Sequence, residues 1–145
     1  MSTRNIIHVI TTIERGGAEN AVATLAIAQS KKGHSVSVLP LKGNPELLQK
    51  LEANGVRVIL SCLNKPIHLQ LRNLKKEVMA TMIVHAHLPR SELLCRLALG
   101  KGRAILTRHN AETFFPKAPR FVSLRLSQWV TKDATLIAIS NAVLT

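Results

Sequence analysis

The sequence predicts a doubly wound α/β domain, a Rossmann-like parallel sheet of about six strands with helices on both faces. Short apolar runs rich in β-branched residues alternate along the chain with longer segments of helical spacing. Gly, Pro and Asn punctuate many of the junctions between them. The chain has 145 residues, of which 46% are hydrophobic. This is enough for one domain whose core needs neither disulfides nor metals.

The strands are expected where apolar residues stand together without helical spacing. In chain order these runs are residues 6–10, 36–41, 56–60, 82–86, 104–108 and 136–139.

The helices are expected where apolar residues recur every three to four positions between start and stop signals. Pro45, Pro66 and Pro119 precede or open three of these segments, and Gly33 and Gly55 close the first two. The segments are residues 18–32, 45–54, 69–80, 91–99 and 120–132. Ser140-Asn141 has the pattern of a helix cap close to Thr145, so we expect residues 1–145 to be one domain of a longer protein.

The chain is strongly basic, with 20 Lys+Arg against 8 Asp+Glu and a net charge of +12. Residues 1–60 hold 7 basic and 4 acidic side chains, whereas residues 61–145 hold 13 and 4. A nucleic-acid interface is one interpretation. Aromatic residues are only 3%, however, and Tyr is absent, so a surface for stacking single-stranded bases has few candidates.

The cysteines and the hydropathy of the sequence indicate the cellular compartment in which the protein is expected. Cys62 and Cys95 form no C-x-x-C motif, which favours a reducing environment without a zinc site of cysteines. No run approaches about 18 consecutive apolar residues, and the N-terminus reads as a strand rather than a secretory signal. We expect a cytoplasmic protein.

The loop after the first strand contains Gly16-Gly17 directly before a helix. Two glycines there allow backbone N–H groups to approach an anion, although a tight turn explains them equally well. The sequence lacks the G-x-G-x-x-G motif of dinucleotide-binding proteins, the phosphate-binding loop of nucleotidases and the G-x-S-x-G elbow of hydrolases.

Three histidines lie near the carboxyl ends of two predicted strands. His85 and His87 are two residues apart on one side of the fourth strand, and His109 follows the fifth. We expect His85 to be a hydrogen-bonded packing residue and His87 and His109 to belong to a site. Histidines at this spacing could share a zinc ion, but only Glu112 stands near as a further ligand, and we expect no metal.

Four segments, each associated with a predicted strand, resemble one known family. They are I-I-H-V-I…G-G-A-E-N (6–20), I-V-H-A-H-L-P (83–89), I-L-T-R-H-N-A-E (105–112) and L-I-A-I-S-N-A-V (136–143). They are similar to the N-terminal domain of family four retaining glycosyltransferases, whose GT-B architecture has two facing Rossmann-like domains. The resemblance covers essentially the whole chain.

The resemblance implies roles for particular residues. His109 would stand beside the transferred sugar at the catalytic centre, and Gly16 and Gly17 would lie under the donor diphosphate. Further residues would line the acceptor-binding cleft between the domains. These are His87, Arg90, Arg108, Asn110 and Glu112.

The resemblance also implies a function. Such enzymes move a sugar from a nucleotide-sugar donor to a saccharide or lipid-linked acceptor in cell-envelope polysaccharide or lipopolysaccharide synthesis, here without a cofactor. The donor is held mainly by a second domain with two glutamates spaced E-x7-E, and this sequence has no such pair. We therefore expect the chain alone to be inactive.

The sequence leaves two alternatives open. One is a non-catalytic basic module for nucleic acid or another anionic polymer, and the other is a sugar-nucleotide epimerase of the same two-domain shape. The basic residues Arg72, Lys75 and Lys76 could dock a peripheral protein on an anionic membrane, or form an ordinary solvated helix face.

Overall fold

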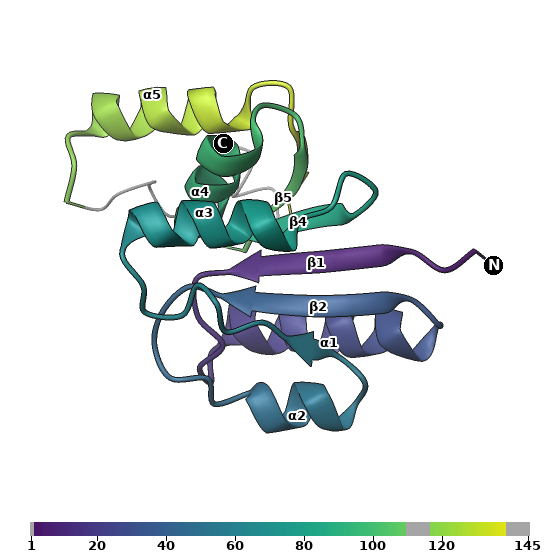
Figure 1. Cartoon of the computed structure of the whole chain (residues 1–145). Coiled ribbons are helices and arrows are strands. Elements are labelled where there is room, and N and C mark those ends of the chain that lie inside the picture. Colours follow the sequence, from purple (N-terminus) through teal and green to yellow (C-terminus); the bar gives the residue numbers. More distant parts are fainter. Residues whose placement is uncertain (1, 110–116, 139–145) are drawn as a thin grey trace.

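The computed structural model describes residues 2–109 and 117–138. Its centre is a six-stranded sheet in the order β3-β2-β1-β4-β5-β6, in which all neighbouring pairs are parallel (Figure 1). The strands are β1 (Asn5–Ile10), β2 (Ser35–Pro40), β3 (Arg57–Val58), β4 (Ile83–His87), β5 (Ala104–Arg108) and β6 (Thr135–Ala138). The predicted fold class is confirmed.

The helices cover both faces of this sheet. They are α1 (Gly17–Lys31), α2 (Leu48–Ala53), α3 (Ile67–Glu77), α4 (Pro89–Leu99) and α5 (Arg120–Thr131). Figure 1 shows α1 and α2 on one side of the strands and α3, α4 and α5 on the other. A parallel sheet needs this double covering because both of its faces are apolar.

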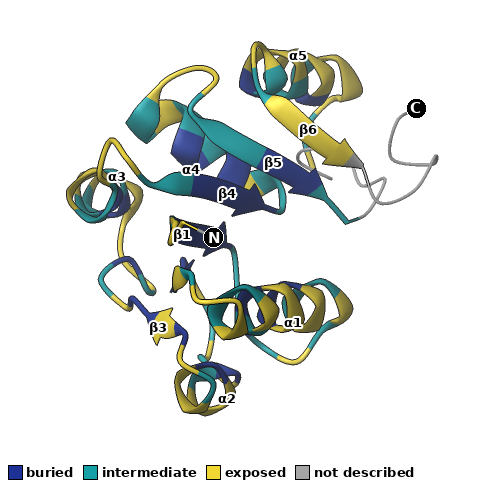
Figure 2. Cartoon of the chain, turned by 90° about the vertical axis from the view of Figure 1, so that its right-hand side faces the viewer, coloured by how far each residue is buried: buried dark blue, intermediate teal, exposed yellow. Residues whose placement is uncertain are grey.

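The core is correspondingly divided into two clusters. Ile7, Val9 and Val84 pack with residues of α3, α4 and α5 on one face, while Ile6 and Ile10 pack with residues of α1 and α2 on the other. Alternate residues of β1 therefore serve opposite clusters, as the pleat of a strand requires. Figure 2 shows that the central strands are the most buried and that β6 is exposed.

The structure corrects several predicted boundaries. The third helix begins at Ile67 rather than 69, and the fourth begins at Pro89 rather than 91. The third strand is shorter than predicted, since β3 covers only two residues rather than 56–60. Its pairing with β2 ends after the hydrogen bond from the Ile59 N–H to Val38 O at 2.9 Å. The second helix begins at Leu48 rather than 45, after a turn in which the Leu48 N–H bonds Pro45 O. The third helix ends at Glu77 rather than 80, since the backbone of the next residue is already extended. The expected cap at Ser140-Asn141 lies outside the described residues.

The strand order determines where a ligand site belongs. From β1 the chain moves outward to β2 and β3, then returns to place β4 on the other side of β1. At such a switch point the loops after the two central strands diverge, and ligands of open α/β sheets bind beside the carboxyl ends there. The loop after β1 and residues 88–90 after β4 occupy this position.

Candidate functional site

The loop after β1 ends in the two glycines. Gly16 is the N-cap of α1 and Gly17 is its first residue, with no side chain capping the helix. The Glu19 carboxylate folds back over Gly16 and accepts a hydrogen bond from Thr12 Oγ1 at 2.7 Å. No heavy atom lies within 4 Å of where a Gly17 Cβ would stand, so the backbone of Gly17 is open to a ligand.

His87 and His109 meet at the same edge of the sheet. His87 is the last residue of β4 and is 1% exposed, whereas His109, one residue beyond β5, is half-buried. Their Nδ1 and Nε2 atoms are 3.3 Å apart. The structure therefore brings together two residues that were assigned to a site from sequence, because neighbouring parallel strands end at one edge.

His85 lies further inside on the same face of β4. Its Nε2 is hydrogen-bonded to Thr107 Oγ1 on β5, and its ring stacks 4.1 Å from that of His87, centroid to centroid. This is the environment expected of a packing histidine.

His8 belongs to this group and was missed by the sequence reasoning. It lies on β1, directly opposite His85 in the parallel register, and is fully buried. Its Nδ1 is 2.9 Å from His87 Nε2, and its Nε2 is 2.7 Å from Gln29 Oε1 on α1. The sequence feature that could have pointed to His8 is its position as the one histidine inside the apolar run of the first strand.

The environment keeps these imidazoles neutral. Burial lowers the pKa of His85 to about 4 and lowers the pKa of His87 further, with the neighbouring imidazoles acting in the same direction. Burial also lowers the pKa of His8, an effect that the hydrogen bond to Gln29 opposes. For His109 burial again lowers the pKa, and the negative charge of Glu19 counteracts it. This charge interaction relates His109 to the first turn of α1, directly after the loop that ends in Gly16 and Gly17 (the glycine loop).

His8, His85 and His87 could in principle offer three nitrogens to a metal, because these atoms lie within 4.8 Å of one another. The Nδ1 of His8 and the Nε2 of His87 are engaged with each other at hydrogen-bond distance instead. Within residues 2–109 and 117–138, this potential ligand group includes no carboxylate or thiolate. A dication there would have no anionic ligand, and the expectation of a metal-free site stays a prediction.

The backbone is strained immediately after His87. Leu88, the N-cap of α4, has φ 72° and ψ 150°, a conformation that glycine adopts far more readily than leucine. Such a residue costs about 1–3 kcal/mol. The strain lies at the switch point beside the histidines, where functional sites commonly hold it.

The remaining predicted site residues lie in different surroundings. Arg108 points from β5 to the opposite face, where its Nη2 is 3.1 Å from Glu92 Oε2 on α4 and donates to Ser127 Oγ on α5 at 2.9 Å. Glu92 is fully buried, and sequence reasoning did not single it out. Arg90 is exposed in the first turn of α4. Asn110 and Glu112 lie outside the described residues. A cleft role for Arg90 and Arg108 remains a prediction.

Comparison with known proteins decides the family. The model of Glycosyltransferase Family 4 matches residues 15–145, a span that includes Gly16 and Gly17, the histidines of β4 and His109. The chain belongs to this family. No curated protein matches the sequence at a significant level.

Membership in Glycosyltransferase Family 4 confirms the resemblance seen in the four sequence segments. It makes the chain a glycosyltransferase domain, and the parallel six-stranded fold agrees with one half of a GT-B architecture. None of the helices in the described part of the chain is long and apolar enough to span a membrane.

Proposed function

We propose that this Family 4 glycosyltransferase domain is the acceptor-side half of a retaining enzyme. The enzyme moves a sugar from a nucleotide-sugar donor to a saccharide or lipid-linked acceptor in cell-envelope polysaccharide or lipopolysaccharide synthesis. The observation that carries this proposal is the meeting of His109 and His87 at the switch point, with the glycine loop beside them.

The glycine loop suits the leaving group. Transfer from a nucleotide sugar develops negative charge on the departing diphosphate, which oriented N–H groups stabilise. The first N–H groups of α1 have no partner within the helix, and Gly17 leaves them accessible. The Glu19 carboxylate, held by Thr12, limits this approach to the Gly17 side.

The rest of the active site belongs to a second domain in this proposal. The chain has no E-x7-E pair for the donor, so we propose that residues 1–145 alone do not catalyse transfer. The leaving group is stabilised by N–H groups and cationic side chains, and the reaction uses no metal or other cofactor.

His109→Ala in the full natural protein is expected to lower sugar transfer by about 100-fold or more, the usual loss for a positioned imidazole. The measurement is release of the nucleotide diphosphate and formation of the glycosylated acceptor. His68→Ala is the matched control, because His68 is an exposed imidazole on α3. Wild-type activity of folded His109→Ala would remove His109 from the proposed site.

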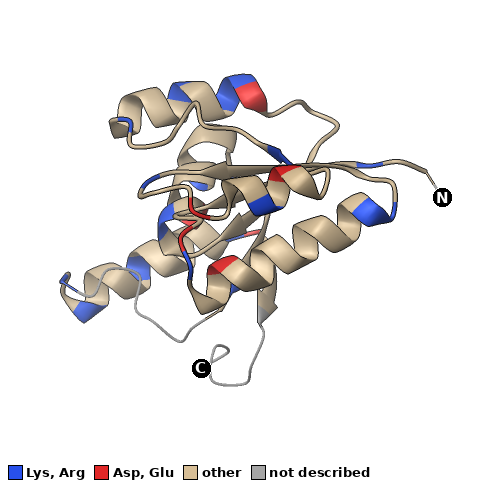
Figure 3. Cartoon of the chain, turned by 90° about the horizontal axis from the view of Figure 1, so that it is seen from below, with Lys and Arg blue, Asp and Glu red and all other residues tan. Residues whose placement is uncertain are grey.

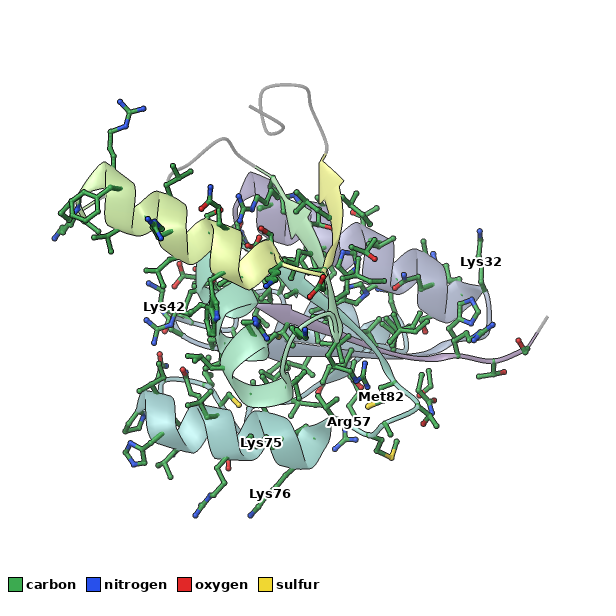
Figure 4. The ribbon with its side chains drawn as sticks, turned by 90° about the horizontal axis from the view of Figure 1, so that it is seen from above. Lys32, Lys42, Arg57, Lys75, Lys76 and Met82 are labelled. Carbon is green, nitrogen blue, oxygen red and sulfur yellow. The ribbon has the colours of Figure 1, made fainter. Side chains whose placement is uncertain are left out.

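A peripheral position on the cytoplasmic face of a membrane forms part of this proposal. Arg72, Lys75 and Lys76 are all exposed on α3. Figure 4 shows Lys75 and Lys76 projecting outward from α3. Figure 3 shows further basic residues on α5, both of them arginines, and no acidic residue on that helix. Cations near an anionic surface each contribute about 1 kcal/mol.

The triple substitution Arg72→Gln, Lys75→Gln and Lys76→Gln is expected to weaken binding to anionic vesicles about 100-fold at low salt. The measurement is co-sedimentation with vesicles of anionic and of neutral lipid. Lys31→Gln, Lys32→Gln and Lys50→Gln form the control, since these exposed lysines lie on the α1 and α2 side. Equal loss in both triple variants, or equal binding to neutral vesicles at all salt concentrations, would contradict a specific membrane surface on α3.

A further inference from the structure

Four polar side chains, three of them from β1, β4 and α1 and the fourth from the residue that follows β5, form one continuous hydrogen-bonded row. His109 Nε2 lies 3.3 Å from His87 Nδ1, and His87 Nε2 lies 2.9 Å from His8 Nδ1. His8 Nε2 in turn lies 2.7 Å from Gln29 Oε1 on α1. Each of the two inner rings uses both of its nitrogens, so the row runs without a break from the half-buried His109 to α1.

The end of this row determines the direction of every bond in it. The Gln29 side chain is oriented with its amide oxygen toward His8 Nε2. An amide oxygen only accepts a hydrogen bond, so in this orientation the Nε2 of His8 carries a hydrogen. Burial keeps the His8 ring neutral by lowering its pKa, which leaves Nδ1 without a hydrogen. That bare nitrogen can only accept, and the bond to it must come from an N–H at His87 Nε2.

The same reasoning passes along His87. Its ring is neutral and almost fully buried, so with Nε2 protonated its Nδ1 is a bare acceptor. The donor to this atom is then the Nε2–H of His109. A neutral imidazole has only one N–H, and His109 uses it inward, toward His87. The Nδ1 lone pair of His109 is what remains for a ligand.

We propose that Gln29 and His8 are positioning residues that set the tautomer of His109 through His87, so that His109 offers a hydrogen-bond acceptor to its ligand. This inference rests on the proposed function, since it concerns the same histidine. It also deepens that function, because a bare Nδ1 binds the hydroxyl group of a sugar or acceptor and not a phosphate oxygen, which has no hydrogen to donate.

The direction of these hydrogen bonds also predicts which side chains can replace Gln29. A carboxylate at this position still accepts from His8 Nε2–H, so Gln29→Glu preserves the row. A methionine of similar length offers no comparable acceptor, so Gln29→Met removes the constraint at its origin. Gln70→Met is the matched control. Gln70 is a glutamine on α3 whose Nε2 bonds Leu41 O and Cys62 O, in the cluster on the opposite face of the sheet.

The test is nitrogen-15 NMR of the histidine rings in this chain at neutral pH, which reports directly which ring nitrogen carries the hydrogen. We expect His8, His87 and His109 each to be a single Nε2–H tautomer in the wild type, in Gln29→Glu and in Gln70→Met. In Gln29→Met we expect mixed tautomers at all three rings. An Nδ1–H tautomer at any of them in the wild type, or an unchanged His109 in folded Gln29→Met, overturns the proposal.

A transfer assay separates this inference from the proposed function. Gln29→Met in the full natural protein is expected to lose activity, and Gln29→Glu is expected to retain most of it. If the NMR pattern is as expected but Gln29→Met transfers sugar at the wild-type rate, the row from Gln29 to His109 does set the tautomers. The proposed catalytic role of His109 is then wrong. If the wild-type NMR pattern is not found, the row fails whatever the activity.

Discussion

Arg108→Met is expected to lower the free energy of unfolding by about 3–5 kcal/mol, the usual effect of removing one partner from a buried ion pair. Glu92 is fully buried, and Arg108 Nη2 at 3.1 Å from its Oε2 is the cation that compensates it. Burial raises the pKa of Glu92 and Arg108 opposes this rise. Without Arg108, the carboxylate must either remain charged in an apolar environment or take up a proton.

The measurement is urea denaturation at two pH values. In the variant the pKa of folded Glu92 lies above its unfolded value, so the destabilisation is largest above that folded pKa and shrinks as the pH falls toward the unfolded value. The loss in Arg108→Met should therefore be smaller at mildly acidic pH than at neutral pH.

Two further variants serve as controls for the effect of Arg108→Met. Lys101→Met breaks the ion pair with Asp133, in which both side chains are more than half exposed, and should cost less than about 1 kcal/mol. Combining Arg108→Met with Glu92→Leu removes both charges and should recover much of the stability. An Arg108→Met protein as stable as Lys101→Met would show that the buried pair does not behave as a unit.

Acid is expected to destabilise the chain well before its carboxylates are protonated. The pKa of folded His85 is about 4, below the ordinary histidine value of 6.5. The unfolded state therefore binds a proton more readily, and stability falls as the pH drops from about 6.5 toward 4. His85 alone accounts for a loss of about 1 kcal/mol by pH 5.5 and about 3 kcal/mol by pH 4. His8 and His87 act in the same direction.

Thermal unfolding between pH 7.5 and 5.5 measures this loss in the range where histidine titrates and most carboxylates do not. His85→Gln should flatten the pH dependence, because a neutral amide replaces an imidazole that resists protonation. His68→Gln should leave it unchanged, since His68 is exposed on α3. A wild-type protein with equal stability at both ends of this range would contradict buried neutral histidines.

Much of the fold could be predicted from sequence. The apolar runs of β1, β2, β4 and β5 are found within one residue of their predicted bounds, and α1 and α5 are also within one residue. The larger errors are at β3, α2, α3 and the start of α4. β3 is an edge strand and α2 is short. A few hydrogen bonds to neighbouring segments therefore determine where these two elements begin and end, and local periodicity does not.

The candidate site likewise contains residues whose positions could be predicted from sequence and residues whose positions could not. His87 and His109 could be paired from sequence because each ends or follows a strand, and parallel neighbours end at one edge. Arg108 directly precedes His109 yet points to the opposite face, where Glu92 and Ser127 hold it. The alternation of a strand predicts that these neighbours diverge, but the sequence does not contain the burial of Glu92 that gives Arg108 its partner.

The sequence by itself determined the α/β class, the double covering of the sheet and the family, because periodicity and short motifs are properties of neighbouring residues. Only the tertiary structure revealed the row from Gln29 through His8 and His87 to His109. His8 and His87 are 79 positions apart, and they meet because β4 pairs with β1 rather than with β3. That choice of strand order depends on how whole elements pack, and no local pattern records it.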